Sequence, residues 1–274
     1  MSAVTASIDA LPNALADAAR FKERLRARSP AVFLDYDGTL TPIVDRPEDA
    51  RISPSMRVAV RGLAKRCTVC VVSGRDRVVV QELMGVDDLV VAGSHGFDIW
   101  SPTDGTIEHG AGSGSEELVQ RVTERIREEV RGIDGALVEP KKASVAVHYR
   151  LVRHDRDREK ISHLVDTLLA ERPGELKVTP GKMVYELQPN LDWDKGKAVL
   201  FLLEALGLDR HDVVPLYLGD DHTDEHAFEA LRGDGIGIFV GRADDPENAG
   251  RTTAADYVLD STEEVQRFLD RLAR

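Results

Sequence analysis

The stretch AVFLDYDGTLTPI, residues 31–43, places two aspartates directly after an apolar, β-branched run. Residues 31–34 predict a buried strand, and Asp35 and Asp37 follow it, before a Gly-Thr turn. Paired carboxylates repel each other, so they need an open edge where a cation or a ligand offsets their charge. In parallel sheets such an edge lies at the carboxyl ends of the strands. The motif therefore predicts a functional pair of acids, with a solvated Asp-rich turn as the alternative.

Composition limits the classes of protein that this chain can form. Its 274 residues, 42% of them hydrophobic, are enough for one large domain or two small ones. The net charge of −12 provides no basic footprint for nucleic acid or for an anionic membrane surface. No apolar run approaches the roughly 20 residues that span a bilayer, and we find no export signal, so we expect a cytoplasmic protein. Cys67 and Cys70 form a CxxC pair within β-branched residues, which favours a buried strand over a redox or zinc site.

Three further apolar runs also end in polar residues. They are residues 68–72, followed by Ser73-Gly74-Arg75; residues 89–92, followed by Gly93-Ser94-His95-Gly96; and residues 213–218, followed by Gly219-Asp220-Asp221-His222-Thr223-Asp224-Glu225. Helical spacing of apolar residues predicts a helix over 11–28, and a Ser-Pro start predicts one over 53–65. Alternating strands and helices are typical of a parallel sheet, so we predict an α/β fold with a doubly wound, mainly parallel sheet.

An insertion interrupts this pattern. Turn-rich residues 101–105 and 110–114 indicate a boundary. Beyond them we expect helices over 115–131 and 155–171, a strand over 143–151, and short strands from Glu175 and Met183, an α+β module of αββαββ type. A helix that follows Lys195 then returns to the sheet. The predicted division is core over 1–103, cap over 104–189 and core again over 190–274.

The polar strand ends together carry five candidate metal ligands: Asp35, Asp37, Asp220, Asp221 and Asp224. Such a carboxylate cluster needs a hard cation inside it, and Mg²⁺ is favoured because it binds carboxylates while keeping waters and substrate phosphate. His222 and His226 are four residues apart, which is also the spacing of a zinc helix. The acids of residues 220–225 could instead stabilise the N-terminus of a helix, although that accounts for only one or two of them.

Taken together, these motifs resemble the haloacid dehalogenase superfamily of phosphatases. The resemblance lies in DYDGT, in the serine of VVSGR, in the lysine of DKGK and in GDDHTDE, which occur in the order of its four signature motifs. Within that superfamily, GSHGFDI, EPKKASVAVHYR, YELQP and NLDWDKGKAV closely resemble the trehalose-6-phosphate phosphatases. One position departs: Gln188 stands where many relatives have Arg, which affects details of the sugar contacts.

The resemblance implies a mechanism for the core residues. Asp35 is expected to attack phosphorus and to form an aspartyl-phosphate, and Asp37 to serve as general acid and then base. Mg²⁺ would be held by Asp35, Asp220 and the Asp37 carbonyl, while Ser73 and Lys195 complete the phosphate cradle. Taken alone, Ser73 could be a helix cap and Lys195 a solvated lysine.

The resemblance also implies substrate contacts, although charged residues on strands are often merely solvated. The expected contact residues are Arg75 and His95 in the core and Glu139, Lys142, His148, Arg150 and Glu186 in the cap. The implied reaction is hydrolysis of trehalose 6-phosphate, the last step of trehalose biosynthesis, with a functional link to trehalose-6-phosphate synthase. The alternatives are a phosphatase for sucrose phosphate or mannosylphosphoglycerate, and a catalytically silent relative that binds sugar phosphate.

Overall fold

The computed structural model describes residues 5–25, 28–108 and 115–274. The chain forms two compact units, which we call the core unit (Met1–Ile107 and Asp194–Arg274) and the cap unit (Glu108–Trp193). The boundaries expected from the sequence lie a few residues earlier, at 103/104 and 189/190, and the functional division of the chain remains a prediction.

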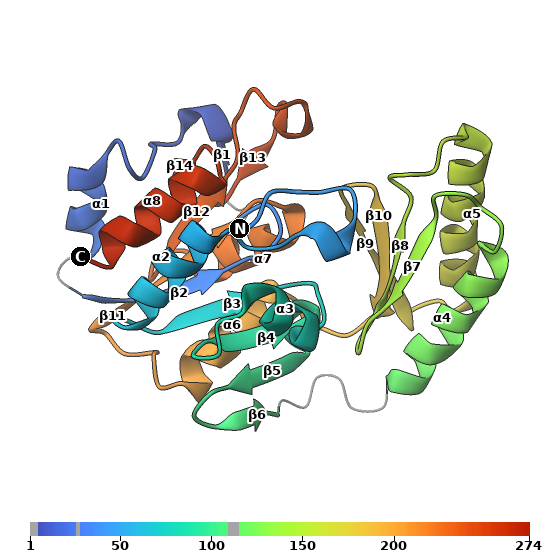
Figure 1. Ribbon diagram of the computed structural model, residues 1–274, viewed down its shortest axis with the longest axis horizontal. Coiled ribbons are helices and arrows are strands. Elements are labelled where there is room, and N and C mark those ends of the chain that lie inside the picture. The colour runs from blue at the N-terminus through green and yellow to red at the C-terminus, as the bar shows by residue number, and fades with distance from the viewer. Residues whose placement is uncertain (1–4, 26–27, 109–114) are drawn as a thin grey trace. The chain divides into compact units, whose positions relative to one another are not determined.

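The core unit is built on an eight-stranded sheet, as far as the described residues show it (Figure 1). Six adjacent strands pair in parallel, and the last two pair antiparallel at one edge. In spatial order the strands are β14 (Tyr257–Leu259), β12 (Ile236–Val240), β11 (Val213–Gly219), β2 (Ser29–Leu34), β3 (Val69–Val72), β4 (Val90–Gly93), β5 (Asp98–Ser101) and β6 (Gly105–Ile107). The predicted mainly parallel sheet is confirmed.

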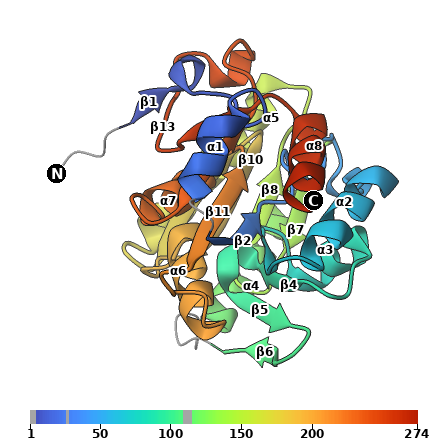
Figure 2. The same ribbon diagram turned by 90° about the vertical axis from the view of Figure 1, so that its left-hand side faces the viewer.

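Helices cover both faces of this sheet, as a doubly wound fold requires (Figure 2). One face packs against α1 (Ala18–Leu25), α2 (Pro54–Ala64), α3 (Arg77–Met84) and α8 (Thr262–Leu272). The other face carries α6 (Lys195–Ala205) and α7 (His222–Ala230). Single-turn helices and a small pair of strands complete the unit: η1 (Ile8–Ala10), η2 (Pro47–Asp49), η3 (Ser94–Gly96), η5 (Pro246–Asn248), β1 (Ala6–Ser7) and β13 (Thr252–Thr253).

Two predicted helices of the core unit had different outcomes. The Ser53 side chain caps α2 by accepting from the Met56 N–H at 3.1 Å, as the Ser-Pro signal predicted. The helix expected over 11–28 was wrong in its first half, because α1 begins only at Ala18. Residues 12–14 instead pair with β14, and the Asn13 side chain accepts from the Leu15 N–H in a local turn. Residues 26–27 lie outside the described part of the chain.

Residues 101–105 form the expected turn, but this turn connects β5 and β6 and so belongs to the core sheet. The expected loop at 110–114 falls outside the described residues. Cys67 and Cys70 are free thiols, and burial raises the pKa of Cys67 to about 11 and raises that of Cys70 further. Burial therefore keeps both thiols protonated, which supports their structural interpretation.

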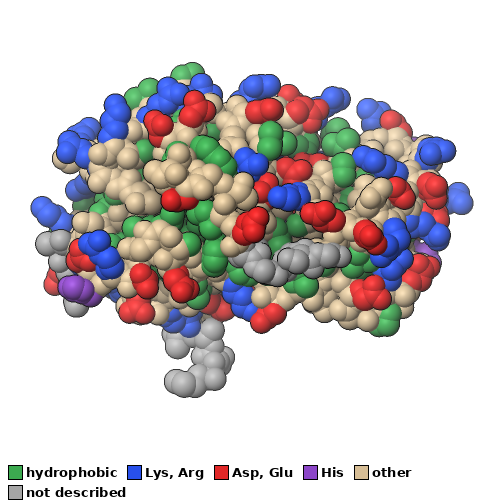
Figure 3. Space-filling view, turned by 90° about the horizontal axis from the view of Figure 1, so that it is seen from below, with side chains coloured by type: hydrophobic (Ala, Val, Ile, Leu, Met, Phe, Trp, Pro, Cys, Tyr) green, Lys and Arg blue, Asp and Glu red, His purple; other side chains and the backbone are tan. Residues whose placement is uncertain are grey.

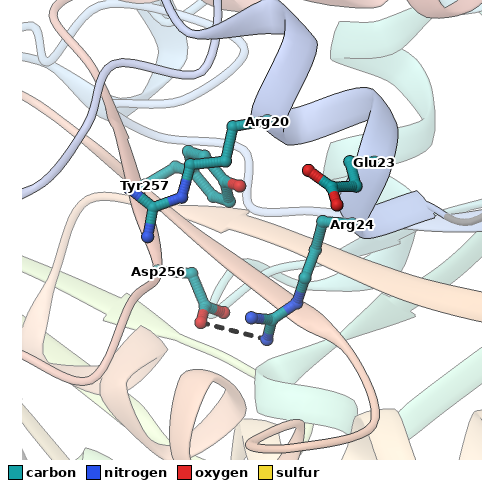
Figure 4. A pocket seen from close by; sticks show the side chains of 5 residues that line it. All are labelled: Arg20, Glu23, Arg24, Asp256 and Tyr257. Atoms are coloured by element: carbon teal, nitrogen blue, oxygen red, sulfur yellow. Dashed lines mark hydrogen bonds and ion pairs between the residues drawn. The ribbon is translucent and has the colours of Figure 1, made fainter.

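A small pocket of about 170 Å³ lies where α1 packs near the start of β14 (Figure 4). Its charged lining is held by an ion pair of 3.2 Å between Arg24 and Asp256. The Asp256 carboxylate also accepts from the Gly237 N–H at 3.0 Å, so these groups stabilise the packing of α1. The residues that line the pocket are Arg20, Glu23, Arg24, Asp256 and Tyr257.

The cap unit has the predicted αββαββ order. Its elements are α4 (Glu116–Glu129), β7 (Leu137–Pro140), β8 (Val145–His148), α5 (Asp155–Glu171), β9 (Leu176–Gly181) and β10 (Val184–Pro189). The four strands form an antiparallel sheet in the order β7-β8-β10-β9. Alternate residues of the strands, such as Val145, Val147 and Leu187, pack with the apolar faces of α4 and α5. The opposite face of the sheet, which we call the polar face, carries Glu139, His148, Glu186 and Gln188 together with small or apolar residues such as Ala146 and Val184.

Charged side chains of both signs lie on the surface, as the composition of the sequence leads one to expect (Figure 3). Acidic and basic side chains lie intermingled on the face drawn in Figure 3. Within the described residues, none of the helices has the length and apolarity that a membrane span needs.

Candidate active site

Strand register brings Asp35 and Asp220 to the same edge of the core sheet. Leu34 at the end of β2 pairs with Leu218 of β11, and the Asp35 N–H donates to the Leu218 carbonyl at 2.9 Å. Asp35 and Asp220 therefore leave the carboxyl ends of adjacent parallel strands. Ligand oxygens of Asp35, Asp220 and Asp224 all lie within 4.8 Å of one another, and the three residues are buried.

Lys195 links two of these carboxylates. It is the first residue of α6, its side chain is 3% exposed, and its Nζ donates to Asp35 Oδ1 at 2.8 Å and to Asp224 Oδ1 at 2.7 Å. The start of α6 lies close to α7, since a Cβ on Gly196 would be 2.3 Å from the His226 carbonyl oxygen. The buried ion pairs exclude the solvated-lysine interpretation of Lys195.

Four hydrogen bonds saturate Asp224. Its Oδ1 accepts from Lys195 Nζ and from the Tyr217 hydroxyl, both at 2.7 Å. Its Oδ2 accepts from the backbone N–H groups of Asp220, at 3.0 Å, and Asp221, at 2.9 Å. Distance alone would admit Asp224 as a metal ligand, but these four donors favour a role as the acceptor that organises the loop and Lys195.

The Asp221 carboxylate caps the N-terminus of α7. It accepts from the His222 N–H at 2.7 Å as the N-cap of the helix, and Asp224 completes a capping box. The helix-start interpretation of GDDHTDE thus applies to Asp221 and Asp224, while it leaves Asp35 and Asp220 unexplained. That Asp37, Asp221 and Asp224 ligate a metal remains a prediction.

The buried cluster of Asp35, Asp220, Asp224 and Lys195 would carry excess negative charge when its carboxylates are ionised. Burial raises the pKa of Asp35 well above its ordinary value, and the Asp224 and Asp220 charges add to this although Lys195 opposes it. Burial also acts to raise the pKa of Asp224, but Lys195 and the hydrogen bonds of Asp224 outweigh it and lower that pKa. Burial acts to lower the pKa of Lys195, and the two carboxylates raise it. The ionised group would carry three negative charges and one positive, so a divalent cation would neutralise it.

The donor set fits Mg²⁺. Asp35 and Asp220 offer only carboxylate oxygens, which hard divalent cations prefer. Gly38 has a φ of +81°, and a Cβ there would lie 2.1 Å from Asp220 Oδ2, so the Asp220 carboxylate rests directly against the backbone of the DYDGT turn. The predicted ligands Asp35 and Asp220 and the turn that contains Asp37 are therefore contiguous.

Asp37 is paired with Arg75. Both Asp37 oxygens accept from the guanidinium, from Nε and from Nη2, at 2.6 Å each. Arg75 also donates to the Pro47 carbonyl at 2.8 Å, and its Cζ lies 5.6 Å from the centre of the Tyr36 ring. This bidentate geometry fixes the Asp37 carboxylate, which is 33% exposed.

Ser73 and His95 form a second small group at the ends of β3 and β4. The Ser73 hydroxyl accepts from the Arg75 N–H at 3.1 Å, and the Ser73 carbonyl accepts from the His95 N–H at 2.8 Å. His95 has a left-handed φ of 56°, which is uncommon outside glycine. Its ring lies so close to Gly74 that a Cβ there would be 2.7 Å from His95 Cε1. Both side chains are buried, and their roles in catalysis and substrate binding remain predictions.

On the cap unit, the polar residues expected from the sequence fall into separate pairs. Glu139 Oε2 lies 2.7 Å from His148 Nε2, and Arg150 donates to the Lys182 carbonyl at 2.8 Å. Glu139 and Glu186 both lie opposite Ala146 in the register, so the two carboxylates share the face away from the helices.

Glu186 is held by residues that the sequence analysis did not single out. It accepts from Lys141 Nζ at 2.9 Å and from the Ser144 hydroxyl at 2.5 Å. Gln188 donates to Thr179 Oγ1 at 2.9 Å on the same face. Lys142 was expected to contact substrate, and this remains a prediction. No such signal marks its neighbour Lys141, because continuing the alternation back from Val145 places residue 141 on the side that faces the helices.

The doubly wound core with its Asp-Lys group, together with the α+β insertion, defines the haloacid dehalogenase-like class of fold. A solved haloacid dehalogenase-like hydrolase from Bacteroides thetaiotaomicron shares it, with a TM-score of 0.63 and 18% identity over 89% of this chain and all of that one. A sequence model of the trehalose-phosphatase family matches residues 33–263. The chain belongs to the trehalose-phosphatase family.

Individual relatives agree with this assignment. Trehalose-phosphate phosphatase of Mycobacterium tuberculosis is 41% identical over 265 residues, 96% of this chain. The chain spans only 66% of the length of that relative. The C-terminal domain of Candida albicans trehalose-6-phosphate phosphatase has the same fold, with a TM-score of 0.79, 22% identity and coverage of 96% of this chain and 98% of that one.

Proposed function

We propose that this chain hydrolyses trehalose 6-phosphate to trehalose and phosphate through an aspartyl-phosphate. The main support is the position of the buried Asp35: Lys195 donates to its Oδ1 at the edge of the sheet, beside Asp220. Membership of the trehalose-phosphatase family supports the substrate class. We also propose that this reaction is the last step of trehalose biosynthesis, that it takes place in the cytoplasm, and that it is linked to the synthase that makes the substrate.

In the proposed reaction, Lys195 fixes Asp35 Oδ1 and leaves Oδ2 to attack phosphorus. A bond forms between Asp35 and phosphorus, the bond from phosphorus to the sugar oxygen breaks, and Asp37 gives a proton to that oxygen. Water then attacks phosphorus while Asp37 takes a proton from that water, the bond between Asp35 and phosphorus breaks, and phosphate is released. Lys195 offsets the charge on Asp35 throughout, and Ser73 donates to the phosphoryl oxygens.

Arg75 must change partner during this cycle. In the structure both Asp37 oxygens accept from the guanidinium, so neither can donate a proton to a leaving group. We expect the substrate phosphate to draw Arg75 away, because a phosphate accepts the same forked pair of hydrogen bonds.

Asp35, Asp220 and the Asp37 carbonyl are the groups that would hold Mg²⁺. When bound, the cation supplies charge neutralisation for the phosphoryl group. The chemistry of the donor set and its two excess negative charges support this assignment.

We assign sugar recognition to the polar face of the cap sheet. Glu139 and Glu186 offer carboxylate oxygens that can accept from sugar hydroxyls, and His148, Arg150 and Lys142 complete the proposed set. A wrong sugar would leave these groups unpaired, which disfavours its binding.

The test is phosphate release from a panel of sugar phosphates in the presence of Mg²⁺. Trehalose 6-phosphate should be the preferred substrate over sucrose phosphate, mannosylphosphoglycerate and monosaccharide phosphates. Asp35→Asn should abolish turnover while the circular dichroism spectrum is unchanged. A preference for another sugar phosphate would overturn the substrate, and full turnover by Asp35→Asn would overturn the nucleophile. Binding without turnover in the wild-type protein would favour a silent relative.

A further inference from the structure

Arg251, on the segment that leads to β13, reaches the loop that carries Asp220. Its Nη1 donates to the Asp220 backbone carbonyl at 2.8 Å, across 31 residues of sequence. The side chain of Arg251 is 8% exposed. Burying a guanidinium lowers the stability of the folded protein unless its N–H groups donate hydrogen bonds.

Two neighbours, Phe239 and Glu225, hold Arg251 in place. Its Cζ lies 4.7 Å from the centre of the Phe239 ring, and its Nη2 donates to Glu225 Oε1 at 3.2 Å. Glu225 is itself fixed, because its Oε2 accepts from Thr253 Oγ1 at 3.1 Å and from the Ala254 N–H at 2.8 Å. Glu225 balances the charge of Arg251, so the effect of Arg251 on Asp220 is mainly geometric.

The backbone of Asp220 is thereby held from both sides. Asp224 accepts from its N–H at 3.0 Å, and Arg251 donates to its carbonyl. With the backbone fixed, the Asp220 carboxylate is directed against Gly38, where no Cβ intervenes. Loss of the Arg251 contact frees the carbonyl side of this peptide and allows the carboxylate to turn.

We propose that Arg251 is a positioning residue that sets the affinity of the Asp220 site for Mg²⁺. This inference rests on the metal site of the proposed function and adds a residue to it. The site requires arginine, because only a planar guanidinium stacks on Phe239 while donating from two nitrogens to Asp220 and Glu225. Groups that orient metal ligands typically change metal affinity by about 10–100-fold when they are removed.

The test is titration of the purified, metal-free whole chain with Mg²⁺ alone in a calorimeter. Arg251→Met, which keeps an apolar stem over Phe239, should weaken Mg²⁺ binding by about 10–100-fold. Arg251→Lys should also bind Mg²⁺ more weakly than the wild type. The matched control is Arg242→Met on the same segment, because Arg242 is 57% exposed and its guanidinium pairs with the nearby Asp244. This control should bind Mg²⁺ like the wild type.

Turnover provides a second measurement. At saturating Mg²⁺, Arg251→Met should recover most of the wild-type kcat with little change in KM for the sugar phosphate, which a merely unfolded variant would not do. If Arg251→Met does not fold, Glu225→Gln provides the same test with a smaller expected loss of Mg²⁺ affinity.

The outcomes separate this inference from the proposed function. Wild-type Mg²⁺ affinity in the folded Arg251 variants, together with loss of binding in Asp220→Asn, would overturn the role of Arg251 and leave the metal site intact. Unchanged binding in Asp220→Asn would overturn the metal site itself.

Discussion

The Arg75 guanidinium donates to both oxygens of the Asp37 carboxylate, each at 2.6 Å. Asp37 lies two residues after the proposed nucleophile and is the proposed general acid, and both of its oxygens accept from Arg75. Arg75 itself is anchored to the Pro47 carbonyl at 2.8 Å. We expect this pair to open when substrate binds, because the proposed proton transfer needs an Asp37 oxygen that is released from Arg75.

Asp37→Asn should affect substrates according to their leaving group. The variant cannot protonate a sugar oxygen, so turnover of trehalose 6-phosphate should fall by about 10²–10⁴-fold. p-Nitrophenyl phosphate needs no such protonation, and its turnover should fall much less. Rates of phosphate and of nitrophenol release measure the two effects. Equal losses for both substrates would exclude Asp37 as the general acid.

Thermal stability should respond to Mg²⁺ in a pH-dependent way. The pKa of Asp35 is raised by burial, so its contribution to stability without metal is full below its unfolded pKa, about 4, and is lost as pH rises through the raised value. Mg²⁺ requires the ionised carboxylate and relieves this loss. The increase in Tm caused by Mg²⁺ should therefore be larger at about pH 8 than at about pH 5. Scanning calorimetry measures it.

Asp35→Asn is the control for this pH dependence. The variant has no titrating carboxyl at this position, so the part of the Mg²⁺ effect that varies with pH should decrease. The same pH dependence in both proteins would assign the effect to another group.

Asp224 and Asp244 allow a comparison of buried and exposed ion pairs. Asp224 is 0% exposed, and its loss leaves the buried Lys195 with one carboxylate, so Asp224→Ala should lower the free energy of unfolding by about 3–5 kcal/mol. Asp244 pairs with Arg242 at 2.7 Å but is 70% exposed, and Asp244→Ala should leave the free energy of unfolding unchanged within error. Urea denaturation measures both values. A similar loss in the two variants would contradict the assigned role of burial.

The sheet could be predicted because its strands are apolar runs with sharp polar ends. The residues after β2 and β11 were expected at a common edge, and the register of Leu34 with Leu218 brings Asp35 and Asp220 there. The signals were local: an apolar run of four residues (31–34) or six (213–218), followed by an Asp-rich turn. Helical periodicity was a weaker signal and failed for residues 11–17, where residues 12–14 pair with β14 instead.

Long-range polar contacts could not be predicted from one sequence. Nothing in the spacing of Tyr217, Arg251 or Lys141 indicates that their donors reach Asp224, the Asp220 carbonyl and Glu186. These contacts depend on how helices and loops pack in three dimensions. Asp221 shows the opposite limit, since an acid next to Asp220 in sequence is compatible with a metal ligand and with a helix cap. The structure shows that it caps α7, and its contact with a metal stays a prediction.

Alanine substitutions at Gly38 and Gly174 distinguish the effect of backbone strain from the effect of crowding beside Asp220. Their φ angles are +81° and +80°, so alanine should meet the same left-handed penalty at each, about 1–2 kcal/mol. Among the described residues nothing lies within 4 Å of a Cβ at Gly174, whereas at Gly38 it would lie 2.1 Å from Asp220 Oδ2. Gly174→Ala should therefore lower stability modestly and keep Mg²⁺ binding. Gly38→Ala should lower stability further and displace the Asp220 carboxylate, with loss of Mg²⁺ binding in the calorimeter. Mg²⁺ binding of wild-type strength in Gly38→Ala would show that the carboxylate of Asp220 does not need its place against the DYDGT turn.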